Sequence, residues 1–141
     1  MNAEGWHADQ IDSFASRLSP LRNALAHGPG GLSPLEKECA IRRFEYCLDG
    51  GWKAAREFLE YSGLTIAPIT PRETIPQAVA ARIVDDAQVW IDMFNHRNLL
   101  AHNYDGVVVA EVIDAIAARY LPAMEQLWQN LAAELQITSA V

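Results

Sequence analysis

The residues of this chain that could do chemistry are concentrated in one stretch, HRNLLAHNYD, residues 96–105. Arg97 and His102 stand five positions apart, with Asn98 beside the arginine and Tyr104 two residues beyond the histidine. A guanidinium holds two phosphate oxygens at once and keeps its charge, and an imidazole exchanges a proton near neutral pH. Together these groups suit phosphate chemistry, including metal-independent cleavage of RNA by attack of a 2′-hydroxyl on the adjacent phosphate.

The spacing also permits a simpler interpretation of the pair. On a regular helix, residues five apart point about 140° away from each other, so Arg97 and His102 converge only if the helix loosens or the arginine wraps around it. Asn98 and His102, four apart, share one face. Arginine and histidine in a last helical turn also cap carbonyls and complement the helix dipole. From spacing alone, capping is the stronger interpretation, because one Arg and one His are a weak signal.

The stretch is expected to form the end of a helix. The sequence NYDG, residues 103–106, is typical of turns, so the helix should end near His102 and leave Tyr104 just beyond it. Leu99 and Leu100 are expected to anchor the segment in the core.

Apolar residues recur at steps of three and four along most of the chain, which predicts amphipathic helices. The expected helices cover residues 9–26, 34–61, 71–83, 85 or 86 to 102, and 107–134. Capping boxes mark two starts, at Ser33 and at Thr70. Gly63 should close the second helix, and Pro122 could bend the last one. The expected fold is all-α, an antiparallel up-and-down bundle of four to five helices in one domain spanning residues 1–141.

Composition and charge limit the class of protein. Half of the 141 residues are hydrophobic, and the formal net charge is −7. This charge gives no general attraction to nucleic acid, so an RNA site would need a local basic patch. The first ten residues do not form a signal peptide, and no apolar run could span a membrane. Cys39 and Cys47, roughly 12 Å apart on one helix, are beyond disulfide reach, and free thiols suit the cytoplasm.

The segment RNLLAHNY, residues 97–104, resembles the R-x4-H-x-Y motif of the HEPN superfamily (higher eukaryotes and prokaryotes nucleotide-binding). The likeness is closest to its branch of nucleotidyltransferase substrate-binding proteins, which includes the toxin partner of minimal nucleotidyltransferases. LEKECAIRRFEYCLDGGWKAAREFLEYSGL is similar to the long second helix of that branch, and VWIDMFNHRNLLAHNYD is similar to its motif helix. The likeness covers the chain from about Leu18 to Leu131, and the superfamily's fold is an up-and-down helical bundle.

This resemblance implies a role for each motif residue. Arg97 and His102 match the pair that carries ribonuclease activity in active HEPN toxins, and Asn98 matches the polar residue that often follows the arginine. Tyr104 matches the tyrosine that a partner nucleotidyltransferase adenylylates, which silences the toxin. In such families two motif helices meet across a homodimer and share the active cleft.

Three hypotheses follow for the function. The first is a HEPN-type toxin, a homodimeric, metal-independent endoribonuclease without a cofactor, controlled by a cognate minimal nucleotidyltransferase antitoxin. The second is a non-catalytic subunit that presents a nucleotide or other substrate to the nucleotidyltransferase. The third is a helical scaffold in which Arg97 and His102 only cap a helix. For the dimer, Trp90, Met93 and Phe94 are expected to offer apolar surface beside the motif.

Other residues with chemical potential have simpler expected roles. His27 and His96 lack the spacing of metal ligands, so His27 is expected at a helix end, while His96 could flank the cleft. The tryptophans are expected in the core or an interface, at Trp6, Trp52, Trp90 and Trp128. The acids expected to complement helix dipoles are Asp85, Asp86 and Asp92. The residues expected to form a solvated charged face are Glu36, Lys37, Glu38, Arg42, Arg43, Glu45 and Lys53.

Overall fold

The computed structural model describes residues 8–63 and 71–140, with side chains placed for residues 9–63 and 71–135. Its helices are α1 (Ala8–Ala24), α2 (Pro34–Tyr61), α3 (Pro71–Ala80), α4 (Ala87–His102), α5 (Gly106–Ala115) and α6 (Leu121–Ala140). A π-helical turn, η2 (Ile116–Tyr120), joins α5 to α6. The described residues contain no strand, and the expected all-α bundle is confirmed.

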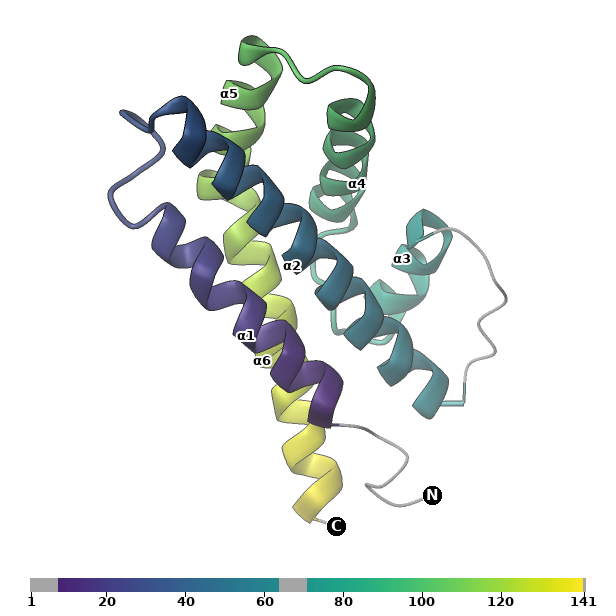
Figure 1. The fold of residues 1–141 in the computed structure, drawn as a ribbon. Helices are drawn as coiled ribbons and strands as arrows, with labels where there is room; N and C mark the ends of the chain where they lie inside the picture. Colours follow the sequence, from purple (N-terminus) through teal and green to yellow (C-terminus); the bar gives the residue numbers. More distant parts are fainter. Residues whose placement is uncertain (1–7, 64–70, 141) are drawn as a thin grey trace.

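The bundle is organised around α2, the longest helix (Figure 1). The helices α1 and α6 pack against α2 and against each other, while α3 and α4 lie on the other side of α2 from α1. The loop between α4 and α5 lies at the end of the bundle where α2 begins. The largest side chains that are completely buried include Phe14, Phe44, Tyr120, Leu21, Ile41 and Met93.

The start of α2 follows the expected capping box. The Glu36 N–H donates to Ser33 Oγ at 3.1 Å, and the Ser33 N–H donates to Glu36 Oε1 at 2.8 Å. Gly63 follows the helix with a φ of 94°, a left-handed conformation that glycine adopts without strain. The helix therefore begins and ends as the sequence predicts.

The two glycines inside α2 allow α1 to approach closely. A Cβ built on Gly51 would lie 3.0 Å from two ring atoms of Phe14, and one on Gly50 would lie 2.8 Å from Cδ of Arg17. Glycine costs a helix about 1 kcal/mol per residue, but the packing against α1 needs the missing side chains. The helix accordingly stays unbroken through both positions, as expected.

Three helix ends differ from the prediction: α1 and α3 end early, while α6 runs to Ala140 rather than ending at residue 134. The helix α1 ends at Ala24 rather than 26, in a turn where Gly28 N–H bonds the Leu25 carbonyl. The helix α3 ends at Ala80 rather than about 83, because Arg82 turns left-handed with a φ of 65°. The expected capping residue Thr70 lies outside the described residues.

The last expected helix is one continuous helical run with a wider turn inside it. In η2 the Leu121 N–H bonds the Ile116 carbonyl five residues back, and Pro122 follows directly. Proline has no N–H to donate, so the regular ladder of hydrogen bonds is interrupted at this point in any case. Just before Pro122 the helix therefore widens into a π turn.

Both cysteines are unbridged, in agreement with their predicted separation. Cys47 is buried, and its thiol donates to the Arg17 carbonyl at 2.8 Å. Burial raises the pKa of Cys47 to about 12. Within residues 8–63 and 71–140, none of the helices combines the length and apolar character needed to cross a membrane.

Candidate functional site

The motif occupies the end of α4 and the connection to α5, as the sequence predicts. The side chain of Asp86 accepts from Gln88 N–H at 3.0 Å and starts α4, which runs to His102. The Asp105 side chain accepts from Val108 N–H at 2.9 Å and starts α5. Tyr104 therefore lies between the C-cap of α4, Asn103, whose N–H bonds the Leu99 carbonyl, and the N-cap of α5, Asp105.

Arg97 lies on the side of α4 that faces the core. It is partly buried, and its spacing places it among the buried residues Trp90, Met93, Phe94 and Leu100. The central carbon of its guanidinium lies 5.0 Å from the centre of the Phe94 ring. Among the described residues, Arg97 makes no ion pair and donates no hydrogen bond. No carboxylate of the described residues therefore neutralises its charge.

His102 and Asn98 are exposed on another side of the same helix. Because α4 remains a regular α-helix through His102, the directions of Arg97 and His102 differ by about 140°. The single chain accordingly does not bring the guanidinium and the imidazole together. In the described part of the chain, neither side chain bonds a helix carbonyl, so the capping interpretation has no hydrogen bond to support it.

Two expectations about apolar residues of this helix were wrong. Leu100 is buried, but Leu99 is 39% exposed, because its position on α4 points away from the core. Trp90, Met93 and Phe94 are at most 5% exposed, since they pack inward, and Phe94 meets Trp52 edge to face at 6.4 Å. These three residues cannot supply a dimer surface. The exposed large apolar residues of the described chain are Leu35, Tyr46, Leu99, Tyr104 and Val107.

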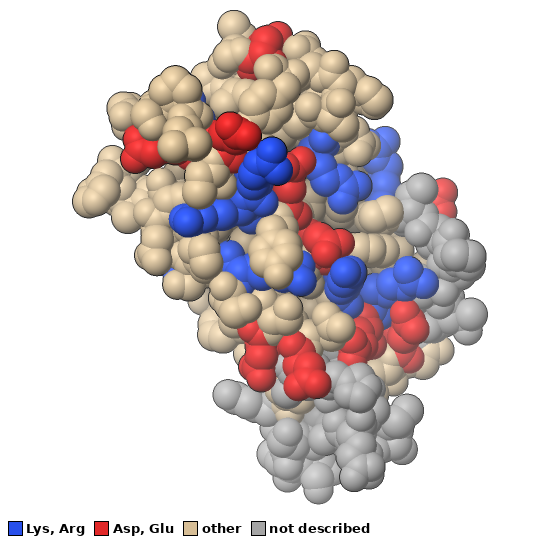
Figure 2. Space-filling model, in the orientation of Figure 1, with Lys and Arg blue, Asp and Glu red and all other residues tan. Residues whose placement is uncertain are grey.

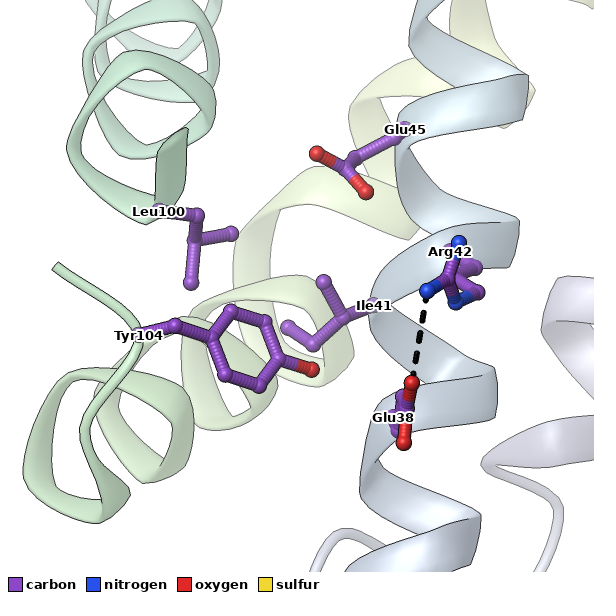
Figure 3. A pocket seen from close by; sticks show the side chains of 6 residues that line it. All are labelled: Glu38, Ile41, Arg42, Glu45, Leu100 and Tyr104. Carbon is purple, nitrogen blue, oxygen red and sulfur yellow. Dashed lines mark hydrogen bonds and ion pairs between the residues drawn. The ribbon is translucent and has the colours of Figure 1, made fainter. Parts of the chain in front are cut away.

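Tyr104 is 51% exposed and borders a pocket of about 250 Å³ (Figure 3). The other lining residues are Glu38, Ile41, Arg42 and Glu45 of α2 and Leu100 of α4. Figure 3 shows the phenol hydroxyl directed toward α2. Partial burial, and then the carboxylates of Glu38 and Glu45, raise the pKa of Tyr104 above its usual value. The phenol therefore carries its proton at neutral pH.

A polar contact between η2 and α4 was not foreseen from the sequence. The hydroxyl of the buried Tyr120 lies 2.7 Å from His96 Nδ1, and His96 Nε2 lies 3.2 Å from Glu111 Oε2. Next to Tyr120, Arg119 donates to Asp92 at 2.6 Å. Arg119 and Tyr120, which are consecutive in the π turn, thus contact Asp92 and His96, which are one helical turn apart on α4. The sequence pattern places Tyr120 in the core, and nothing there pairs it with a histidine 24 positions away.

Most of the remaining charged and aromatic residues take the simple roles expected. Asp92 is an exception, because it lies beyond the first turn of α4 and pairs with Arg119. Figure 2 shows Lys and Arg side chains in a band across α1 and α2, with Asp and Glu among them. The cations of α2 with a carboxylate one helical turn away are Arg42, Lys53 and Arg56. His27 is exposed just past α1, and Trp90 is buried, whereas Trp6 lies outside the described residues. The described residues contain no group of three or more His, Cys, Asp or Glu that could hold a metal ion.

Comparisons with known proteins agree with the helical fold. A family model described as nucleotidyltransferase substrate binding protein like matches residues 9–133. A crystal structure of a protein from Thermus thermophilus is 27% identical with a TM-score of 0.68, over 86% of this chain and 98% of that chain. No curated protein matches the chain. The match over most of the sequence shows that the chain belongs to the family of nucleotidyltransferase substrate-binding-like proteins, a HEPN-like helical family whose description implies association with a nucleotidyltransferase.

Proposed function

We propose that this chain is the toxin of a toxin–antitoxin pair, a homodimeric endoribonuclease that a partner nucleotidyltransferase silences by adenylylating Tyr104. One observation carries the proposal. Arg97, the arginine of the R-x4-H-x-Y motif, is held against Phe94 with no carboxylate partner among the described residues. An arginine that only stabilised the fold would normally be paired or exposed.

In the proposed reaction, Arg97 binds two oxygens of the scissile phosphate and stays charged as negative charge builds up. His102 accepts the proton of the 2′-hydroxyl, whose oxygen attacks phosphorus, and the bond from phosphorus to the 5′-oxygen breaks. The leaving oxygen takes a proton from water, giving a 2′,3′-cyclic phosphate and a 5′-hydroxyl end. Asn98, on the same face as His102, orients the substrate or the histidine.

The geometry of α4 favours a site built from two chains. Since Arg97 and His102 point about 140° apart on one helix, Arg97 of one protomer would act together with His102 of its partner. The exposed apolar residues beside the motif, Leu99 and Val107, are available for such an interface. A stable dimer would bury at least about 1,000 Å² in total.

Silencing follows from the charge and bulk that Tyr104 gains. Its phenol oxygen attacks the α-phosphorus of ATP, pyrophosphate leaves, and the phenolic proton passes to a base of the nucleotidyltransferase. The new phosphodiester is negative, so Glu38 and Glu45 repel it from the pocket on α2. The tethered phosphate then competes with RNA for Arg97 at high effective concentration.

The proposal is tested by following cleavage of a labelled RNA in the presence of a chelator. Arg97→Ala and His102→Ala should each lose cleavage on the order of 100-fold or more, while the helical signal and melting temperature stay close to those of wild type. Arg56→Ala, which removes a partly buried arginine paired with Glu60, is the matched control and should cleave normally. If both motif variants melt early and the wild type neither binds nor cuts RNA, catalysis by this chain is ruled out.

The family description favours a second candidate, a non-catalytic subunit that presents a substrate to the nucleotidyltransferase. Co-expression with the cognate nucleotidyltransferase, followed by mass spectrometry, separates the two. A toxin should gain one or more AMP groups and lose activity, while Tyr104→Phe stays unmodified and active. A wild-type chain that stays unmodified and never harms the host would support the subunit instead.

A further inference from the structure

The pocket beside Tyr104 contains more acidic than basic groups. It is lined by two carboxylates, Glu38 and Glu45, and by one guanidinium, Arg42. Its apolar part consists of Ile41 and Leu100, and the phenol ring of Tyr104 forms one wall (Figure 3). With these three charged side chains ionised, the pocket has a surplus of negative charge.

The two carboxylates differ in their partners. Glu38 accepts from Arg42 at 3.3 Å, but both side chains are largely exposed, so water screens this pair and it exchanges readily. Glu45 is partly buried, and among the described residues it has neither an ion-pair nor a hydrogen-bond partner. Figure 3 shows its carboxylate directed into the space between α2 and Leu100.

These groups favour one kind of occupant. A phosphate or a carboxylate would be repelled by Glu38 and Glu45, while a guanidinium or an ammonium would neutralise Glu45. The exposed face of an aromatic ring also attracts a cation, and Ile41 and Leu100 can cover the aliphatic part of a long side chain. The pocket has the charge and the lining for an arginine or a lysine.

We propose that this pocket receives an arginine or lysine side chain of the partner nucleotidyltransferase, which thereby docks next to Tyr104. The inference rests on the proposed function for the identity of the partner. In the free chain Arg42 pairs with Glu38 and so neutralises part of the negative charge of the pocket. Arg42 is therefore an internal competitor, which the incoming cation displaces from Glu38.

Docking of a cation would also prepare Tyr104 for reaction. The carboxylates of Glu38 and Glu45 oppose ionisation of the phenol in the free chain. A positive charge placed between them and the ring removes this opposition, so the phenol becomes a better nucleophile only in the complex. The modification is thereby restricted to the partner that supplies the cation.

The test compares the affinity of the cognate nucleotidyltransferase for the wild-type chain, for variants expected to weaken binding and for a variant expected to strengthen it. Glu45→Lys should weaken binding about tenfold or more, because the lysine repels the partner's cation where the carboxylate attracted it. Glu45→Gln should weaken binding less, because it removes the attraction without adding a repulsion. Arg42→Gln should strengthen binding, since it removes the internal competitor. Glu60→Gln, on the same helix but outside the pocket, is the control and should change nothing.

The outcomes separate this inference from the proposed function. Equal affinities for wild type, Glu45→Lys and Arg42→Gln would overturn the docking site while leaving the toxin proposal intact. A nucleotidyltransferase that binds none of the chains would overturn both. If Glu45→Gln instead changes only the affinity for a single-stranded RNA oligonucleotide, the pocket belongs to the RNA site and the inference is wrong. Circular dichroism of each variant is the check that it is folded.

Discussion

Arg97 and His102 occupy different sides of α4, the first stacked against Phe94 at the edge of the core and the second exposed to solvent. The helix between them is regular, so a single chain holds the two groups about 140° apart. A second copy of the chain is the simplest way to supply the missing group to each site. The proposed cleavage of RNA therefore depends on cooperation between protomers.

The contact between Tyr120 and His96 should stabilise the position of α4. Tyr120→Phe keeps the ring stacked on Phe44 but removes the hydroxyl from His96 Nδ1, so we expect a loss of about 1 kcal/mol at neutral pH. Urea unfolding measures this loss. Tyr46→Phe, at a position 58% exposed, is the control and should stay close to wild type.

The same tyrosine should make the protein sensitive to alkali. Burial raises the pKa of Tyr120 to about 12, while an unfolded tyrosine ionises near 10. The unfolded state then loses its proton first, so this contribution to stability is full below pH 10 and falls as the pH rises toward 12. Unfolding curves at several pH values should show that the free energy of unfolding falls less for Tyr120→Phe than for wild type as the pH rises from 10 to 12. Parallel losses in the two proteins would contradict the buried, protonated state of Tyr120.

The close approach of α1 to α2 should make Gly51 intolerant of a side chain. Alanine gains about 1 kcal/mol of helix propensity, but its Cβ meets the rigid, buried ring of Phe14 at 3.0 Å. Overpacking costs about 1 to 3 kcal/mol, so we expect Gly51→Ala to be destabilised overall. Gly30→Ala, which meets nothing within 4 Å, is the control. A Phe14→Leu background should reduce the penalty at Gly51, and an unchanged penalty there would argue against this contact.

The two cysteines should react at very different rates. Cys47 is buried with a pKa raised to about 12, and Cys39 is only partly buried. Because the thiolate is the reactive form, iodoacetamide should label Cys39 in the folded protein and Cys47 only after unfolding. Mass spectrometry at successive times measures both rates directly, and comparable rates for the two thiols would contradict the burial of Cys47.

The sequence predicted the helices well where local chemistry marks their ends. Ser33 with Glu36 specifies the start of α2, and NYDG specifies the end of α4. The end of α3 was missed because the left-handed position is taken by Arg82, which carries no signal of the kind that glycine gives. The π turn was missed because Pro122 signals only an interrupted hydrogen-bond ladder, and this does not specify the bond from Leu121 N–H to the Ile116 carbonyl.

The motif residues could be named from the sequence, but their surroundings could not. Periodicity alone does not show that Trp90 and Met93 face the core while Leu99 faces solvent, because the choice of face depends on how α4 packs. The position of Tyr104 near carboxylates of α2 likewise joins segments about 60 residues apart and needs the folded chain.

The most direct test mixes two inactive variants of the protein. Arg97→Ala and His102→Ala are purified separately, unfolded and refolded together in equal amounts, with sedimentation to verify dimers. If each site combines Arg97 of one protomer with His102 of the other, half of the dimers are mixed and each regains one of its two sites. RNA cleavage should then return to about a quarter of the wild-type level. Dimers that form but remain inactive after mixing would show that both residues must come from one chain, which would contradict the shared site.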